Sequence, residues 1–188
     1  MNDFAIRQEL KESILSKYIE DDDSLVLDEY NLSLGIVRAD IAVVNGVLHG
    51  YEIKSEKDSL IRLENQMLEY NKFFEYVTIV SCTKFINKII DISPSHCGVI
   101  SAEMINNKVV LKTIRKAKKN YNLDKISLVK ALWREEMIDL LEDMNYKRGF
   151  KSKSKPLLYE ILISEFTKKQ LVDIVKCKLK NRVNWKVD

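Results

Sequence analysis

The chain has 188 residues, 46% of them hydrophobic, with only five glycines and two prolines, which predicts one globular core plus a small appendage. No apolar run is long enough to cross a bilayer, and residues 1–10 carry acids where a signal peptide would have an apolar segment. Three widely spaced cysteines, without metal-ligand spacing, are expected to be reduced thiols. We therefore expect a cytoplasmic protein with no membrane partner.

The net charge of +3 hides a strong asymmetry along the chain. Residues 1–110 hold 11 Lys and Arg against 18 Asp and Glu, whereas residues 111–188 hold 20 against 10. A separate basic part is typical of proteins that bind phosphate groups. The acidic part is compatible with a metal site, although the run Asp21, Asp22 and Asp23 is better interpreted as a solvated loop.

The predicted elements of the first part alternate between helix and strand. Hydrophobic periodicity predicts helices at 4–19, 57–75 and 85–90, and strands at 24–28, within 38–54, and at 77–82, 99–102 and 108–114. The strand at 77–82 is nearly all apolar, as in strands buried on both faces. The order α-β-β-β-α-β predicts an α/β fold with a mixed central sheet.

The pattern changes after Ile114, where the basic run 115–119 suggests a boundary between a core (1–114) and a basic helical appendage (115–188). Helices are predicted at 126–144, 156–165 and 167–182. The break near Gly149 carries Lys147, Arg148, Lys151 and Lys153. Two interpretations stay open: the appendage binds DNA backbone, or it caps the sheet with solvated lysines.

Residues 38–54 read as a β-hairpin around Asn45-Gly46, which is a strong turn signal. A two-residue turn pairs Val44 with Val47 and puts Asp40 on the face opposite Glu52. A three-residue turn pairs Val43 with Val47, so that Gly50 lies opposite Asp40. We prefer the second, because it separates the polar side chains from the apolar ones.

In the preferred register Arg38, Asp40, Glu52 and Lys54 share one face, and Gly50 leaves space for a metal. Two carboxylates suit Mg²⁺ or Mn²⁺, and Lys54 would orient a water or offset charge on a phosphate. The alternative is an ordinary amphipathic hairpin with a solvated polar face. His49, on the apolar face, is interpreted as a core histidine.

The helix predicted at 57–75 carries Arg62, Gln66 and Tyr70 at intervals of four, so they lie on one stripe. Packed on the sheet, this stripe would bring Gln66 and Tyr70 to the carboxylates and Arg62 to a phosphate. The alternative is that Tyr70 is half-buried core and that Arg62 and Gln66 face solvent.

Asp40, Glu52-x-Lys54 and Gln66-x-x-x-Tyr70 together resemble the PD-(D/E)XK nuclease superfamily, including the Gln-x-x-x-Tyr element of its RecB-like branch. Residues 38–55, Arg62-Leu63, Gln66, 132–136 and 179–182 are similar to its sce7726 family. The resemblance implies a restriction-endonuclease-like core and metal-dependent phosphodiester hydrolysis. It would make Asp40, Glu52, the Ile53 carbonyl and Glu9 metal ligands, and Lys54 catalytic. The chain departs from the pattern in having no proline before Asp40 and no histidine in the first helix.

The sequence therefore predicts a Mg²⁺-dependent deoxyribonuclease, with RNA not excluded as a substrate and no prediction of oligomeric state. Gln66 and Tyr70 would shape the site. Phosphates would be positioned by Arg38, Arg62, Lys147, Arg148, Lys151 and Lys153. Two alternatives are a nucleic-acid-binding protein that does not cut, and a protein-interaction module of a defence system.

Overall fold

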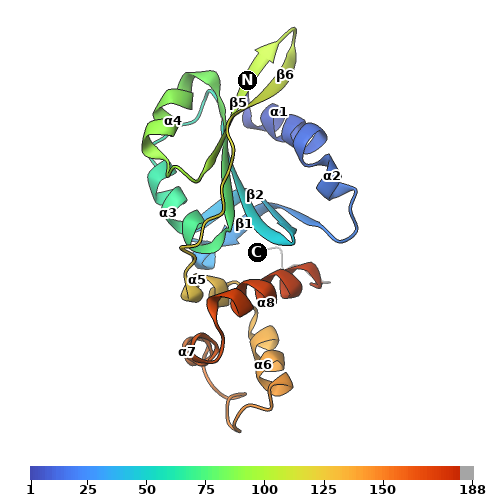
Figure 1. The fold of residues 1–188 in the computed structure, drawn as a ribbon, viewed down its shortest axis with the longest axis vertical. Helices are drawn as coiled ribbons and strands as arrows, with labels where there is room; N and C mark the ends of the chain where they lie inside the picture. Colours follow the sequence, from blue (N-terminus) through green and yellow to red (C-terminus); the bar gives the residue numbers. More distant parts are fainter. Residues whose placement is uncertain (183–188) are drawn as a thin grey trace.

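A six-stranded mixed sheet organises the molecule, and the strands lie in the sheet in the same order as in the sequence (Figure 1). The computed structural model describes residues 1–182, apart from the side chain of Ser33. β3 pairs in parallel with β4, and β4 with β5, while the other neighbours are antiparallel. The strands are β1 (Leu25–Leu32), β2 (Val37–Asn45), β3 (Val47–Lys54), β4 (Tyr76–Cys82), β5 (Gly98–Ile105) and β6 (Lys108–Arg115). The predicted α/β class with a mixed central sheet is confirmed.

Helices cover both faces of this sheet (Figure 1). The N-terminal segment, predicted as one helix, consists of α1 (Asp3–Glu9), a π-helical turn (Leu10–Ile14) and α2 (Ser16–Ile19). It buries Ile6 and Leu10 against the sheet. The opposite face is covered by α3 (Leu63–Phe73) and α4 (Ile86–Ile92). Within residues 1–182, no helix is long and apolar enough to span a membrane.

α3 is shorter than the predicted helix at 57–75 because its first two turns are replaced by a side-chain-stabilised loop. The Asp58 carboxylate accepts hydrogen bonds from the Ser55 backbone N–H, at 2.8 Å, and from the Ser55 hydroxyl. Such local bonds offer the backbone an alternative to helix. The helix therefore begins only at Leu63, with Arg62 as its N-cap.

The C-terminal part is helical, as predicted, but it has four helices instead of three in the described range. They are α5 (Lys125–Lys130), α6 (Arg134–Asp143), α7 (Lys155–Glu165) and α8 (Lys168–Lys180). The helix predicted at 126–144 is divided at Trp133, whose backbone is extended and whose N–H donates to Glu136 Oε2 at 2.7 Å. A capping interaction of this kind starts a new helix.

The helical appendage shares one hydrophobic cluster with the sheet and α3. Leu128 of α5 and Leu171 of α8 are fully buried in the cluster that also holds Val44 and Phe73. The segment that joins β6 to α5 is itself fixed, because the Asn120 N–H donates to the Glu75 carbonyl at 2.8 Å. The appendage thus packs on the sheet, while the division at residue 114 stays a prediction.

The hairpin has a different register from the one predicted. Val44 pairs with Leu48 and Ile41 with Tyr51, so Asn45, Gly46 and Val47 form the connection, with Gly46 at φ +59°. The predicted pairing of Val43 with Val47 is wrong, because Val43 pairs with His49, two positions further along β3. The shift is even, and side chains alternate with period two. Asp40 and Glu52 therefore still share a face, and continuing the register puts them directly opposite each other.

The space predicted beside Gly50 for a metal is filled by an aromatic ring. Gly50 lies opposite Ala42, and a Cβ placed on it would come within 2.4–2.9 Å of the Phe74 ring. That ring is in edge contact with Tyr70, at 5.5 Å between centroids, and with Phe73, at 5.0 Å. The glycine is needed for the close approach of α3 to the sheet.

We expect Gly50→Ala to lower the free energy of unfolding by about 1–3 kcal/mol, because the added methyl group overpacks the Phe74 pocket. Urea unfolding followed by circular dichroism measures the loss. The Phe74→Leu substitution makes room for the methyl group, so the double variant should lose less than the sum of the two single losses. Additive losses would show that Phe74 does not make the glycine necessary.

Candidate functional site

Four predicted site residues meet between β3 and α3. The Glu52 carboxylate, 1% exposed, forms an ion pair with Lys54 through Oε1 at 2.6 Å and accepts a hydrogen bond from the Tyr70 hydroxyl at Oε2. Lys54 Nζ also donates to Gln66 Oε1 at 2.9 Å. The structure therefore brings Glu52, Lys54, Gln66 and Tyr70 together. Burial and then the neighbouring Glu52 raise the pKa of Tyr70 well above its usual value, so the hydroxyl keeps its proton and acts as a donor.

Asp40 lies beside this group, at the point where β2 turns away from β3. Its Oδ2 accepts a hydrogen bond from the Ile53 backbone N–H at 2.6 Å. Burial and the charge of Glu52 raise the pKa of Asp40 to about 7, although the Ile53 N–H and Arg7 act in the opposite direction. Two carboxylates that are close together and poorly solvated do not ionise easily at the same time.

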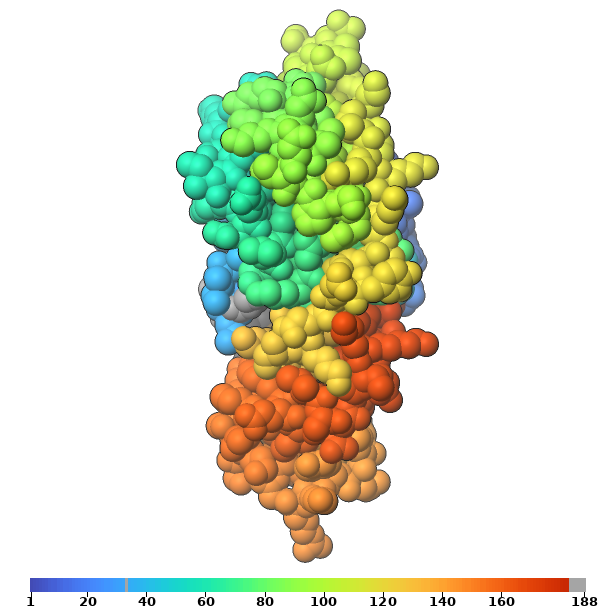
Figure 2. Space-filling model, turned by 60° about the vertical axis from the view of Figure 1, so that its left-hand side comes forward, coloured from blue at the N-terminus to red at the C-terminus, as the bar shows by residue number. Residues whose placement is uncertain are grey.

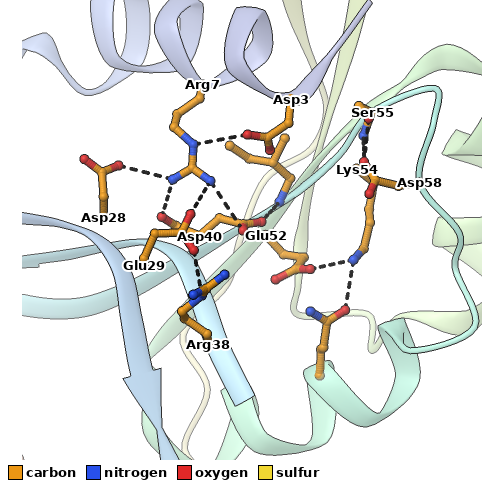
Figure 3. Close-up of polar contacts among 12 residues, drawn as sticks. Asp3, Arg7, Asp28, Glu29, Arg38, Asp40, Glu52, Lys54, Ser55 and Asp58 are labelled. Carbon is orange, nitrogen blue, oxygen red and sulfur yellow. Dashed lines mark hydrogen bonds and ion pairs between the residues drawn. The ribbon is translucent and has the colours of Figure 1, made fainter. Parts of the chain in front are cut away.

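Arg7 of α1 is the residue of this site that sequence reasoning missed. Its Nη1 donates to the Asp40 carbonyl at 2.6 Å, and Nη2 lies 3.5 Å from Asp40 Oδ1. Figure 3 shows the guanidinium surrounded by acidic side chains, which are Asp3, Asp28, Glu29 and Asp40. The spacing of four between Asp3 and Arg7 was a weak sequence signal for an ion pair on α1.

Glu29 connects Arg7 to Arg38. Its Oε1 lies 2.7 Å from Arg7 Nη2 and its Oε2 lies 2.6 Å from Arg38 Nε. The backbone of Glu29 has φ +54°, a conformation that non-glycine residues seldom adopt. Two charge-assisted hydrogen bonds offset the cost of this strained backbone. They connect Glu29 of β1 to Arg7 of α1 and to Arg38 of β2, next to Asp40.

Positive charge close to the two carboxylates comes from Lys54 and Arg7. Within residues 1–182, no three His, Cys, Asp or Glu side chains form a group that could hold a metal ion. The metal-binding role of Glu9 stays a prediction. Asp40 Oδ1, with only the 3.5 Å contact to Arg7, is the carboxylate oxygen best able to accept a cation. The metal-binding roles of Asp40, Glu52 and the Ile53 carbonyl, with Mg²⁺ or Mn²⁺, stay predictions.

Of the residues predicted to bind nucleic acid, Arg38 lies beside this cluster, whereas the lysines and arginine of the basic loop between α6 and α7 do not. Arg38 has an exposed side chain but is paired with Glu29, and Arg62 is exposed at the start of α3. The basic loop between α6 and α7, which carries Lys147, Arg148, Lys151 and Lys153, lies at the far end of the appendage (Figure 1). Lys151 is paired with Glu142.

Fold and site together define an α/β protein in which a buried network of charged residues joins the hairpin to α1 and α3. The model of the bacteriophage P4 protein cII family matches residues 2–186, and the chain belongs to this family. Protein cII of Enterobacteria phage P4 is 32% identical over 160 residues, which are 85% of this chain and 60% of that protein. The chain therefore spans about 60% of this relative's length. No solved structure matches the chain.

Membership of the cII family corrects the family assignment made from the motifs. The resemblance to the PD-(D/E)XK superfamily and its sce7726 family is wrong, and so is the prediction of a Mg²⁺-dependent deoxyribonuclease that followed from it. The motif residues do converge, but they form a buried, internally neutralised network instead of an open pair of carboxylates. The restriction-endonuclease-like core remains an interpretation of the element order alone.

Proposed function

We propose that the protein binds nucleic acid, with DNA as the favoured partner, by contacts to the phosphate backbone and without cutting it. The observation that carries this proposal is the surplus of positive charge after residue 110, where the chain has 20 basic and 10 acidic residues. Phosphate contacts supply most of the affinity in sequence-independent binding.

Exposed cations lie in two places on the basic part. The first group lies on β6 and on the segment after it and consists of Lys112, Lys116 and Lys118. The second group lies in the loop between α6 and α7 and consists of Lys147 and Arg148. Within residues 1–182, none of these five side chains forms an ion pair with the protein, so each is available to a phosphate. In Figure 2 the yellow segment after β6 runs down one side of the molecule to the red surface of α8.

The contacts of α8 help to fix the position of this basic surface. Lys119 and Lys176 both approach the buried carboxylate of Glu75, at 2.9 and 4.0 Å. Glu75 also accepts a hydrogen bond from the Leu48 N–H at 3.1 Å. One buried acid thus holds the basic segment after β6, the basic helix α8 and the hairpin together, and this keeps the exposed lysines on a rigid surface.

The buried network supports binding without cleavage. Both oxygens of Glu52 are engaged by the protein, and Phe74 fills the space beside Gly50. Buried ion pairs fix how elements pack in some proteins. The role that we propose for the network is to hold the hairpin, α1 and α3 in one arrangement, while the basic appendage makes the contacts with phosphate.

Fluorescence anisotropy with a labelled DNA duplex at several salt concentrations tests this function. We expect the logarithm of the affinity to fall linearly with the logarithm of the salt concentration. Replacing both Lys147 and Arg148 by alanine should weaken binding equally for unrelated sequences and reduce the slope by about 2, because two phosphate contacts are lost. The DNA should be recovered at full length after incubation with Mg²⁺.

The matched control replaces two exposed lysines of the acidic part, Lys57 and Lys88, by alanine. This variant removes the same charge and should leave the slope unchanged. Binding that does not depend on salt, an equal effect of both double variants, or shortened DNA would each contradict the proposal.

A further inference from the structure

A shallow cavity of about 410 Å³ lies on the face of the sheet that α1 and α2 cover only in part. It crosses β3, β4, β5 and β6 beyond the end of α2, away from the Asp40–Glu52 network on the other face. Its volume falls within the range of small-ligand sites. Neither the charged network nor the basic loop between α6 and α7 contributes to it.

The cavity is lined by a cluster of aromatic rings. His49 is stacked on Tyr51, with centroids 4.2 Å apart and planes at 22°, and it contacts Tyr76 at 5.7 Å. Tyr18 of α2 forms a further part of the wall. The prediction that His49 is an ordinary core residue is therefore incomplete, because its ring is only partly buried and contributes to a surface that can stack on a ligand.

Hydrogen bonds hold the His49 ring in place. His49 Nε2 lies 2.8 Å from Thr78 Oγ1, and Nδ1 lies 3.3 Å from the Tyr51 hydroxyl. Burial lowers the pKa of His49 to about 3, so the ring is neutral at physiological pH and presents a flat face without charge. Gly98 lets the backbone of Ala117 approach, because a Cβ there would lie 2.9 Å from the Ala117 nitrogen.

The rim of the cavity is positively charged. Lys116 is an exposed residue of the lining, and Lys17 lies 4.8 Å from the centroid of the Tyr18 ring, which is part of the wall. Arg115 forms part of the wall and is fixed by hydrogen bonds to the Cys97 carbonyl, at 2.7 Å, and the Ser93 hydroxyl, at 2.6 Å. Among the described residues that line the cavity there is no Asp or Glu.

We propose that this cavity binds an unpaired base of a single-stranded nucleic acid, with the base on the partly exposed rings of His49 and Tyr76 and its phosphate near Lys116. The inference rests on the proposed function and adds to it a preference for single strands. Aromatic rings bordered by cations are the recurring surface for unpaired bases, since every base has a face that can stack. The exposed hydroxyl of Thr113 is available to the edge of the base.

The test compares three labelled nucleic acids by anisotropy: a short single strand, the same strand with every base removed, and the matching duplex. The wild-type protein should bind the intact single strand more tightly than the abasic one. Tyr76→Ala should weaken binding of the intact strand by roughly 10- to 100-fold and leave the abasic strand and the duplex unchanged. Tyr76→Phe should retain the affinity, and so should Tyr121→Ala, which removes an exposed ring outside the cavity.

A strand containing 2-aminopurine gives a second measurement on the wild-type protein, independent of how well any variant folds. Its fluorescence should be quenched on binding if the base stacks. Equal affinity for intact and abasic strands, or no quenching, would overturn the assignment of the cavity. In that case salt-dependent binding of the duplex would leave the proposed function standing, whereas loss of binding to all three nucleic acids would remove the proposed function itself.

Discussion

The Glu52→Ala variant is expected to lose about 3–5 kcal/mol of unfolding free energy, the usual result of removing one member of a buried ion pair. Lys54 is 6% exposed and would keep only Gln66 as a partner, at 2.9 Å. The Tyr70 hydroxyl would lose its acceptor as well. Chemical unfolding monitored by tryptophan fluorescence and circular dichroism measures the change.

A double variant separates the net contribution of the ion pair to stability from the cost of leaving Lys54 buried without its partner. Glu52→Leu together with Lys54→Met replaces both charges by apolar side chains of similar size. Such replacements of whole buried pairs are often neutral or stabilising. We therefore expect the double variant to be more stable than Glu52→Ala, with a coupling energy well above that of exposed pairs.

Glu103→Ala on β5 is the matched control, because it removes an exposed glutamate from another strand of the same sheet. It should change stability by less than about 0.5 kcal/mol. A loss of less than 1 kcal/mol for Glu52→Ala would contradict the view that the network fixes the hairpin against α3.

The hairpin and its polar face were predictable because they depend on local rules. Asn45-Gly46 marks the turn, and the alternation of side chains decides which residues share a face. An even error of register preserves the face, so Asp40 and Glu52 were correctly placed together even though Gly50 was placed opposite the wrong residue. The stripe of Gln66 and Tyr70 followed from helical spacing in the same way.

Arg7 and Phe74 were not predictable, because their roles depend on contacts between elements distant in the sequence. Arg7 reaches Asp40 from 33 residues away, and Phe74 reaches Gly50 from the end of α3. These two contacts change the interpretation of the site. The first adds positive charge beside the carboxylate, and the second fills the space beside Gly50.

The family assignment failed for a related reason. Asp, Glu-x-Lys and Gln-x-x-x-Tyr specify residue types and spacing, and a buried ion-pair network uses the same types at the same spacing as a catalytic site. Carboxylate, ammonium, amide and phenol groups are complementary to one another as well as to a phosphate. The whole-chain match to the cII family draws on positions far outside this pattern.

In the presence of EDTA, titration of Asp40 should lower the free energy of unfolding as the pH rises from about 4 to 7. Its pKa is 3.8 in an unfolded chain and about 7 in the folded protein, so across this interval the folded state holds a proton that the unfolded state has lost. The unfolded state binds fewer protons, and the free energy of unfolding therefore falls with rising pH. The full contribution is about 4 kcal/mol at 1.36 kcal/mol per pKa unit.

The Asp40→Asn variant isolates this contribution, because asparagine keeps an acceptor oxygen for the Ile53 N–H and cannot ionise in this range. The stability of the wild-type protein relative to Asp40→Asn should fall between pH 4 and 7 and level off above pH 8. A constant difference would show that the folded protein does not raise the pKa of Asp40.

The predicted Mg²⁺ would act on the same carboxylate. At pH 8, above the pKa of Asp40, a cation bound only by the folded state should raise the unfolding midpoint with increasing concentration. We expect Asp40→Asn to abolish that increase, with Glu103→Ala as the variant that retains it. An unchanged wild-type midpoint with Mg²⁺ and with Mn²⁺, in a protein that shows the pH dependence, would contradict the metal site. Lys54 and Arg7 would then supply all the positive charge that the two carboxylates require.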